Sequence, residues 1–320
     1  MQTQSELWAI VLAGGSGKRL EPLTSALYGA AVPKQFAAIA GQQTLLTQTL
    51  ARTARLVPES QIVVVATQTH AALARREQNG FPAIQLVLQP SNLDTGIGIL
   101  VGLTQVLARS PDARVLVLPS DHYVRDESRF LSALSDAAIC GATCDIALAL
   151  VGVRPQAAER EYGWIVPGPA LPSPGFDARA GKLTALRRVE RFVEKPSTEL
   201  ANDLYHQGAL WNTLAFSGSA RSCWRLCAEC LPEVVKGFAS YSETVGTARE
   251  DAALNALFSE LGSTNFSERV LTRAAPLLGV VECADVGWSD IGTPARVFES
   301  LKGTPEALLL EQRLAQQRSL

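Results

Sequence analysis

The sequence predicts an α/β protein with a doubly wound, mostly parallel sheet and helices on both faces of that sheet. Short apolar segments alternate with longer segments of helical periodicity through about the first 150 residues, a pattern typical of β-α-β units. The apolar segments are continuous, as expected of strands that are covered on both faces. The 320 residues, 47% of them hydrophobic, suffice to bury a large core without disulfides.

The expected elements follow in order along the chain. Strands are predicted at residues 8–12, 62–66, 86–88, 115–118 and 146–150, with helices at residues 43–55, 68–78, 95–108 and 127–140. Residues 152–184 are rich in Pro and Gly, and we expect a loop region there. A strand at 188–194 and a helix near 198–207 follow. A tail over residues 304–320 opens with Thr-Pro-Glu, a good helix start.

The composition excludes several classes of protein. Lys and Arg (29) nearly balance Asp and Glu (31), so neither a nucleic-acid partner nor a membrane is expected. The N-terminus lacks the basic start of a secretory signal, and no apolar stretch reaches the length of a membrane span. Cys223, Cys227 and Cys230 share one helix face, which favours a packed core over a metal site. Six cysteines are no disulfide scaffold in a chain this long, and the cytoplasm is the expected compartment.

A glycine-rich segment follows the first predicted strand. Gly14-Gly15-Ser16-Gly17 comes directly after the apolar run and precedes Lys18 and Arg19. Glycine leaves backbone N–H groups free to face an anion, so the segment predicts a phosphate-binding loop. A P-loop is excluded because Leu12 and Arg19 occupy two of its required positions, and a dinucleotide fingerprint is excluded by Leu20. The alternative is a tight strand-to-helix turn with no ligand.

Six further motifs occur downstream of this loop, which is itself continued by Pro33-Lys34-Gln35. In chain order they are Gln89-Pro90-Ser91-Asn92, Pro119-Ser120-Asp121-His122, Glu161-Tyr162-Gly163-Trp164, Val193-Glu194-Lys195-Pro196, Leu210-Trp211-Asn212 and Trp288-Ser289-Asp290-Ile291-Gly292. The set resembles the sugar-1-phosphate nucleotidyltransferase family, most closely its mannose-1-phosphate guanylyltransferase branch. The resemblance runs from residue 8 to residue 292. It implies a Rossmann-like nucleotidyltransferase catalytic domain over residues 1–303.

The resemblance also implies an activity. The chain would be an enzyme that transfers a nucleoside monophosphate from a nucleoside triphosphate, GTP above all, to a sugar 1-phosphate. With mannose 1-phosphate the products would be GDP-mannose and pyrophosphate. Because the attacking phosphate oxygen is already charged, alignment and charge neutralisation should suffice for catalysis. No further domain such as a cupin-type isomerase is recognised, and we expect a single activity.

Roles for individual residues follow from the matching motifs. The nucleotide would be bound by Gly14, Gly15, Ser16, Gly17, Gln89, Asn92 and Thr95, and the sugar by Gly163, Glu194 and Asn212. The catalytic residues would be Arg19 on the triphosphate, Lys34 on the α-phosphate, Lys195 on the sugar phosphate, and Asp121. Asp121 and Asp290 would hold Mg²⁺, which proteins commonly bind through one or two carboxylates plus phosphate oxygens. Helix capping is the alternative role for both aspartates.

Four positions depart from the family pattern. Lys18 replaces a small hydroxyl residue, and Gly96-Ile97-Gly98 replaces Ala-Pro-Ala after Thr95. Thr213-Leu214 replaces Ser-Gly, and Asn265 stands where an Asp is expected, so a carboxylate is lost there. Three of these changes fall on base or sugar recognition. Two alternatives therefore stay open: the same chemistry with another base or sugar, and a non-catalytic nucleotide-sugar-binding homologue that regulates a partner.

The tail offers a possible contact between copies. Leu308, Leu309 and Leu310 give the predicted tail helix an apolar face. This face can dock on the chain's own core or on a second copy, so a homodimer is possible.

Overall fold

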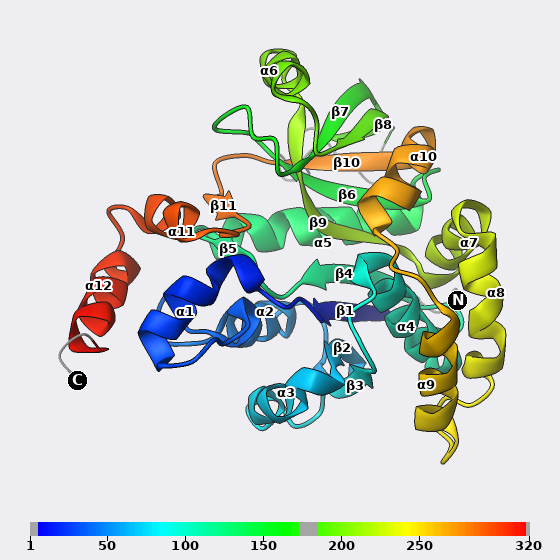
Figure 1. Cartoon of the computed structure of the whole chain (residues 1–320). Coiled ribbons are helices and arrows are strands. Elements are labelled where there is room, and N and C mark those ends of the chain that lie inside the picture. Colours follow the sequence, from blue (N-terminus) through cyan, green and yellow to red (C-terminus); the bar gives the residue numbers. More distant parts are fainter. Residues whose placement is uncertain (1–5, 173–184, 318–320) are drawn as a thin grey trace.

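One mixed sheet organises the fold in the computed structural model, which describes residues 6–172 and 185–317 (Figure 1). Its strands lie in the order β3-β2-β1-β4-β9-β6-β10-β8-β7, and β5 and β11 form a small second sheet. The strands are β1 (Leu7–Ala13), β2 (Ile62–Thr67), β3 (Gln85–Gln89), β4 (Arg114–Pro119), β5 (Tyr123–Val124), β6 (Leu148–Val153), β7 (Gly163–Ala170), β8 (Leu186–Glu194), β9 (Leu210–Ser219), β10 (Leu278–Cys283) and β11 (Trp288–Ser289).

Helices cover both faces of this sheet. They are α1 (Glu21–Tyr28), α2 (Leu45–Thr53), α3 (Ala71–Gln78), α4 (Asp94–Arg109), α5 (Glu127–Thr143), α6 (Thr198–His206), α7 (Ala220–Cys230), α8 (Pro232–Ser242), α9 (Glu250–Glu260), α10 (Thr272–Ala274), α11 (Pro294–Leu301) and α12 (Pro305–Gln317). Strand β1 shows how the faces are divided. Trp8 and Ile10 share a core with α4 and α7, whereas Ala9 and Val11 share one with α2.

The predicted α/β fold is confirmed, and the sheet is more mixed than a doubly wound pattern implies. Strands β3, β2, β1 and β4 are mutually parallel, as are β6 and β10. Strand β9 runs antiparallel between β4 and β6. Strand β9 is not among the strands predicted from the sequence, because polar residues such as Asn212, Thr213 and Ser217 interrupt its apolar run. Although β9 is buried along almost its whole length, hydrophobicity alone does not reveal the direction of a strand.

The Pro- and Gly-rich region is not simply the predicted loop. Residues 163–170 form β7, which pairs with β8 and lies last in the sheet order. The register of this pair shifts at Pro167, as expected because proline lacks the N–H that a ladder needs and is tolerated at sheet edges and bulges. Residues 173–184 of the same region, and residues 318–320 of the predicted tail, lie outside the described residues.

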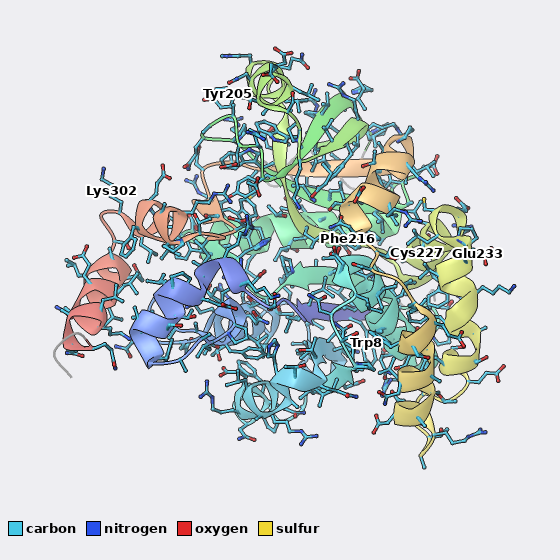
Figure 2. All side chains as sticks on the ribbon, in the orientation of Figure 1. Trp8, Tyr205, Phe216, Cys227, Glu233 and Lys302 are labelled. Atoms are coloured by element: carbon cyan, nitrogen blue, oxygen red, sulfur yellow. The ribbon has the colours of Figure 1, made fainter. Side chains whose placement is uncertain are left out.

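The cysteine-bearing helix is a core helix, as predicted. Cys223, Cys227 and Cys230 in α7 are all buried against the sheet, and the six cysteines are free thiols. Figure 2 shows Cys227, Trp8 and Phe216 in the interior, with Glu233 at the surface. Within the described residues, no helix is long and apolar enough to cross a membrane.

The tail helix docks on its own chain. Leu310 of α12 is buried beside Leu20 and Leu27, and the guanidinium of Arg313 donates to the carbonyl of Ala38. Leu308, in contrast, is 63% exposed. Part of the predicted apolar face is thus used within the chain.

Candidate active site

A cleft of about 350 Å³ lies where β1, β3 and β4 end, bounded on its other side by β7, β8, β9 and β11. The carboxyl ends of parallel strands are where α/β proteins bind their ligands. Almost every residue assigned to the site from the sequence lines this cleft: Gly14, Gly15, Arg19, Lys34, Gln89, Asn92, Thr95, Asp121, Gly163, Glu194, Lys195, Asn212 and Asp290. Segments far apart in the sequence are thereby brought together at one place.

Ser16 and Gly17 do not line the cleft. Ser16 is exposed, and Gly17 adopts a φ of 65°, the left-handed region that glycine favours. A Cβ at Gly17 would lie 2.7 Å from the backbone nitrogen of Lys34. Gly17 therefore permits the glycine loop to approach the Lys34 segment closely.

The Lys34 ammonium is the centre of the cleft's polar network. Its Nζ lies 3.1 Å from Oδ2 of Asp121 and donates to the backbone carbonyl of Asp290 over 2.6 Å. Lys34 is only 8% exposed, so these oxygens replace the water that the charge loses on burial. The contact joins three chain regions, the turn after Pro33, the end of β4 and the segment after β11.

The neighbouring Gln35 fixes this turn to the glycine loop. Its side-chain amide donates to the carbonyls of Ala13 (3.0 Å) and Gly15 (2.7 Å), and the residue is buried. Gly14 lies close to the Gln89 side chain on the other side, since a Cβ at position 14 would lie 2.6 Å from Nε2 of Gln89. The loop thus passes between Gln35 and Gln89.

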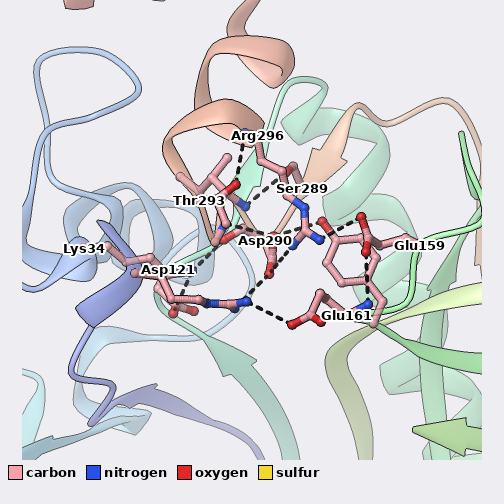
Figure 3. Close-up of polar contacts among 12 residues, drawn as sticks. Lys34, Asp121, Glu159, Glu161, Ser289, Asp290, Thr293 and Arg296 are labelled. Atoms are coloured by element: carbon pink, nitrogen blue, oxygen red, sulfur yellow. Dashed lines mark hydrogen bonds and ion pairs between the residues drawn. The ribbon is translucent and has the colours of Figure 1, made fainter. Parts of the chain in front are cut away.

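Asp290 is held by a set of donors that sequence reasoning missed in part (Figure 3). Its Oδ1 accepts hydrogen bonds from the hydroxyl of Tyr162 (2.9 Å) and the backbone N–H of Gly292 (2.9 Å). Arg296 donates to both carboxylate oxygens, at 3.0 and 3.2 Å, and pairs with Glu159 at 2.7 Å. Arg296 also lies over the Tyr162 ring. No local motif marks Arg296 or Glu159, so only the fold reveals them.

Neither aspartate caps a helix. Asp126 caps α5 and Thr293 caps α11, so the capping alternative for Asp121 and Asp290 is wrong. Arg19 reaches the same region from the glycine loop, pairing with Glu161 at 3.1 Å and lying 3.9 Å from Asp290.

Both aspartates are ionised at neutral pH. Burial raises the pKa of each carboxyl, but the Lys34 charge and hydrogen bond at Asp121, and the Lys34 and Arg296 charges at Asp290, outweigh burial and hold the pKa of each below its usual range. Burial lowers the pKa of His122, which keeps the ring neutral beside Asp121. Burial and the Asp290 charge raise the pKa of Tyr162, which stays a donor.

The opposite side of the cleft carries neutral and weakly acidic groups. A Cβ at Gly163 would meet Oε2 of Glu194 at 2.7 Å, so this glycine makes room for the carboxyl group. Burial raises the pKa of Glu194 to about 7, Lys195 opposes the shift, and Asp94 and Glu268 add to it. Asn212 bonds Ser267 (3.5 Å) and accepts from the backbone N–H of Leu214. These groups suit hydroxyl hydrogen bonding.

Comparison with known proteins decides the family. The family model described as nucleotidyl transferase matches residues 8–306. The chain belongs to the nucleotidyl transferase family. The xanthan biosynthesis protein XanB of Xanthomonas campestris pv. campestris (strain B100) is 31% identical over 300 residues, which cover 90% of this chain and 58% of XanB.

Two further relatives support the same branch of nucleotidyl transferases. Mannose-1-phosphate guanylyltransferase of Escherichia coli K12 is 29% identical over 313 residues, 95% of this chain and 61% of that enzyme. The chain therefore spans about three-fifths of the length of these relatives. A crystal structure described as mannose-1-phosphate geranyltransferase from Thermus thermophilus superposes with a TM-score of 0.74 at 28% identity, covering 94% and 80% of the two chains.

Three of the four departures from the nucleotidyl transferase pattern place residues in the cleft, namely Gly98, Leu214 and Asn265. Leu214 lines the cleft with a φ of 57°, where the family pattern has glycine. The Asn265 amide lies 3.3 and 3.4 Å from the two carboxylate oxygens of Asp94, and both residues line the cleft. The carboxylate that is missing at position 265 is therefore supplied by Asp94, on the other side of this contact. Lys18, in contrast, is exposed and does not line the cleft.

Because Leu214 has a positive φ, we predict that glycine at this position gives a more stable protein than alanine does, the reverse of the usual order. A side chain in the left-handed region costs about 1–2 kcal/mol, so Leu214→Gly is expected to be more stable than Leu214→Ala by about 1 kcal/mol. Urea unfolding measures the difference. Ser132, exposed in α5, is the control, because there alanine should be the more stable of the two. Equal stabilities at position 214, or a more stable alanine, would contradict the strain.

The raised pKa of Glu194 predicts a pH-dependent stability. Between the unfolded pKa near 4.5 and the folded pKa of about 7, the folded protein binds the extra proton. This contribution is complete below the unfolded pKa and is lost as the pH rises through 7. The free energy of unfolding of Glu194→Gln should therefore rise relative to that of the native protein from pH 5 to pH 8. Glu190→Gln, exposed on the same strand, should show the same pH dependence as the native protein. If the free energy of unfolding of Glu194→Gln also changes with pH in parallel with that of the native protein, the raised pKa of Glu194 is refuted.

Proposed function

We propose that this chain transfers a nucleoside monophosphate from a nucleoside triphosphate to a sugar 1-phosphate, with release of pyrophosphate. GTP and mannose 1-phosphate are the proposed substrates, and GDP-mannose is the proposed product. The observation that carries the proposal is the position of the Lys34 ammonium. It contacts Asp121 and the Asp290 segment and lines the cleft together with the glycine loop. The relatives named as mannose-1-phosphate guanylyltransferases support the choice of substrates.

The chain's own groups account for most of this chemistry. Gly14, Gly15 and Arg19 line the cleft where the triphosphate would lie. Lys34 would neutralise the α-phosphate as charge develops, and Lys195, 59% exposed, would receive the sugar phosphate. Preorganised positive charge of this kind lowers the barrier without a general base, because the attacking oxygen is already ionised.

The residues present fit a Mg²⁺ ion. Asp121 and Asp290 are ionised and border the same cleft, and Mg²⁺ prefers carboxylate and phosphate oxygens. Within residues 6–172 and 185–317 no group of three or more His, Cys, Asp or Glu side chains could hold a metal ion. Mg²⁺ commonly takes its remaining ligands from phosphate and water. Bound there, Mg²⁺ would neutralise charge on the transferring phosphates.

The departures from the family pattern that line the cleft favour a second candidate, the same transfer with another base or sugar. Leu214, Asp94 and Asn265 lie on the side that would contact the nucleoside and sugar, whereas the phosphate side keeps the family residues. A homodimer and a cytoplasmic location stay predictions from the sequence.

Pyrophosphate release measured over a matrix of nucleoside triphosphates and sugar 1-phosphates tests the proposal. Turnover is expected with GTP and mannose 1-phosphate in the presence of Mg²⁺, and none is expected after chelation of the metal. Asp121→Asn should lower kcat about 100-fold or more. Asp112→Asn, whose side chain is 87% exposed, is the control and should retain the native rate. Absence of turnover with every pair of substrates would refute the proposed transfer reaction. Full turnover in the presence of a chelator would refute the requirement for Mg²⁺.

A further inference from the structure

Two segments that lie 171 residues apart in the sequence form one wall of the cleft. The first is the N-terminal turn of α4, beginning at Asp94, and the second is the stretch from Thr264 to Ser267 that follows α9. Figure 1 shows the chain between α9 and α10 passing beside α4. Asp94, Thr95, Asn265 and Ser267 all line the cleft.

The backbones of these two segments are locked together. Gly96 donates its N–H to the carbonyl of Thr264 (2.8 Å), and Thr264 donates to the carbonyl of Leu93 (2.9 Å). A Cβ at Gly96 would lie 2.7 Å from the Thr264 carbonyl oxygen, closer than real Cβ atoms come. The approach therefore depends on glycine at position 96, where the family pattern has alanine. The departures at 96 and 265 are thus parts of one local rearrangement.

The same rearrangement aims the Asp94 side chain at Asn265. Asp94 has a φ of 70°, and its N–H donates to the side-chain oxygen of Asn92 (3.0 Å). Asp and Asn tolerate this left-handed backbone better than most residues do. One carboxylate oxygen accepts from the N–H of Thr95 (2.6 Å), and both face the Asn265 amide. A carboxylate offers about four acceptor positions, so these contacts leave Asp94 with acceptor capacity toward the cleft.

Asp94 lines the same cleft as the residues assigned to the nucleotide and to the sugar. It follows Gln89 and Asn92, the residues assigned to the nucleotide, by only a few positions. Its negative charge also acts on Glu194, on the side assigned to the sugar, where it adds to the effect of burial and raises the pKa of that carboxyl. An acceptor at this place is suited to groups that present N–H or O–H donors, as bases and sugar hydroxyls do.

We propose that Asp94 is a specificity-determining residue of the cleft and that Asn265 is its positioning partner. One carboxylate and one amide are required across the contact, and Asp94 supplies the carboxylate that the family pattern places at position 265. The carboxylate accepts hydrogen bonds from neutral N–H or O–H groups of the bound nucleotide sugar. This inference rests on the proposed function for the identity of that ligand.

A charge exchange between the two positions tests the pair. Both Asp94→Asn and Asn265→Asp are nearly isosteric, so they change charge and leave the volume of the wall as it is. Asp94→Asn removes the carboxylate, and Asn265→Asp places two carboxylates at hydrogen-bonding distance, where like charges repel. Each single variant should weaken the binding of GDP-mannose about tenfold, measured by calorimetry. The double variant Asp94→Asn/Asn265→Asp should return to within about threefold of the native Kd.

The control is Glu268→Gln, which removes an exposed negative charge near Glu194 without altering a residue that lines the cleft. Its Kd should stay within about twofold of the native value, so that a general charge effect is separated from a specific contact. Additive losses in the double variant, or native affinity in Asp94→Asn, would overturn the proposal. Repeating Asp94→Asn with GDP identifies the donor: equal weakening assigns it to the nucleotide, and weakening with GDP-mannose alone assigns it to the sugar.

Urea unfolding of the native protein, the two single variants and the double variant provides a measurement that needs no ligand. The single variants should unfold at lower urea concentrations and the double variant near the native midpoint, because the carboxylate–amide contact is restored. Failure of the native protein to bind GDP-mannose would count against the proposed substrates alone. If the effects of the two substitutions on the free energy of unfolding are simply additive, the result would count against the Asp94–Asn265 contact and not against the proposed substrates.

Discussion

The structure depends most on the buried ammonium of Lys34. Burying a charge is costly unless oppositely charged or polar groups replace its water, and Lys34 meets the Asp121 carboxylate and the Asp290 carbonyl within 3.1 Å. These partners lie far from Lys34 and far from each other in the sequence. Satisfying one ammonium therefore brings the turn after Pro33, the end of β4 and the segment after β11 to one place.

The surrounding contacts keep that arrangement rigid. Gln35 ties the Lys34 turn to the glycine loop, and Gly17 allows the two to approach. On the other side, Arg296 and Tyr162 hold the Asp290 side chain, and Glu159 holds Arg296. Because Lys34 and, at Asp290, Arg296 offset the effect of burial, both aspartates remain ionised. A cleft that presents fixed charge of both signs in this way is suited to phosphoryl transfer.

The sequence predicted those parts of the site that local patterns encode. Continuous apolar strands, the glycine loop and short motifs such as Pro33-Lys34-Gln35 carry their information within a few residues, and nearly all the residues they indicated line the cleft. Arg296 was missed because no motif marks it, although it lies only six residues after Asp290. Glu159 was missed because its partner, Arg296, is distant in the sequence. Strand β7 was missed because Pro167, which breaks most strands, is tolerated at a register shift near the edge of the sheet.

The wall formed by Asp94 and Asn265 was misjudged for a related reason. A sequence shows that a carboxylate is missing at position 265, but not that a second carboxylate lies 3.3 Å away. Compensation between residues distant in sequence becomes visible only when the fold places them together. The same holds for Gly96 and Leu214. The structure alone shows that Gly96 permits a close approach to Thr264 and that Leu214 has a positive φ.

The most direct test of this account is the rate of pyrophosphate release by Lys34→Met under saturating substrates. The account predicts a loss of about 100-fold or more in kcat, with circular dichroism still showing the native α/β fold. Lys236→Met, exposed on α8, should keep the native rate. A Lys34→Met protein that folds and turns over within about threefold of the native rate would contradict the central role given to this ammonium.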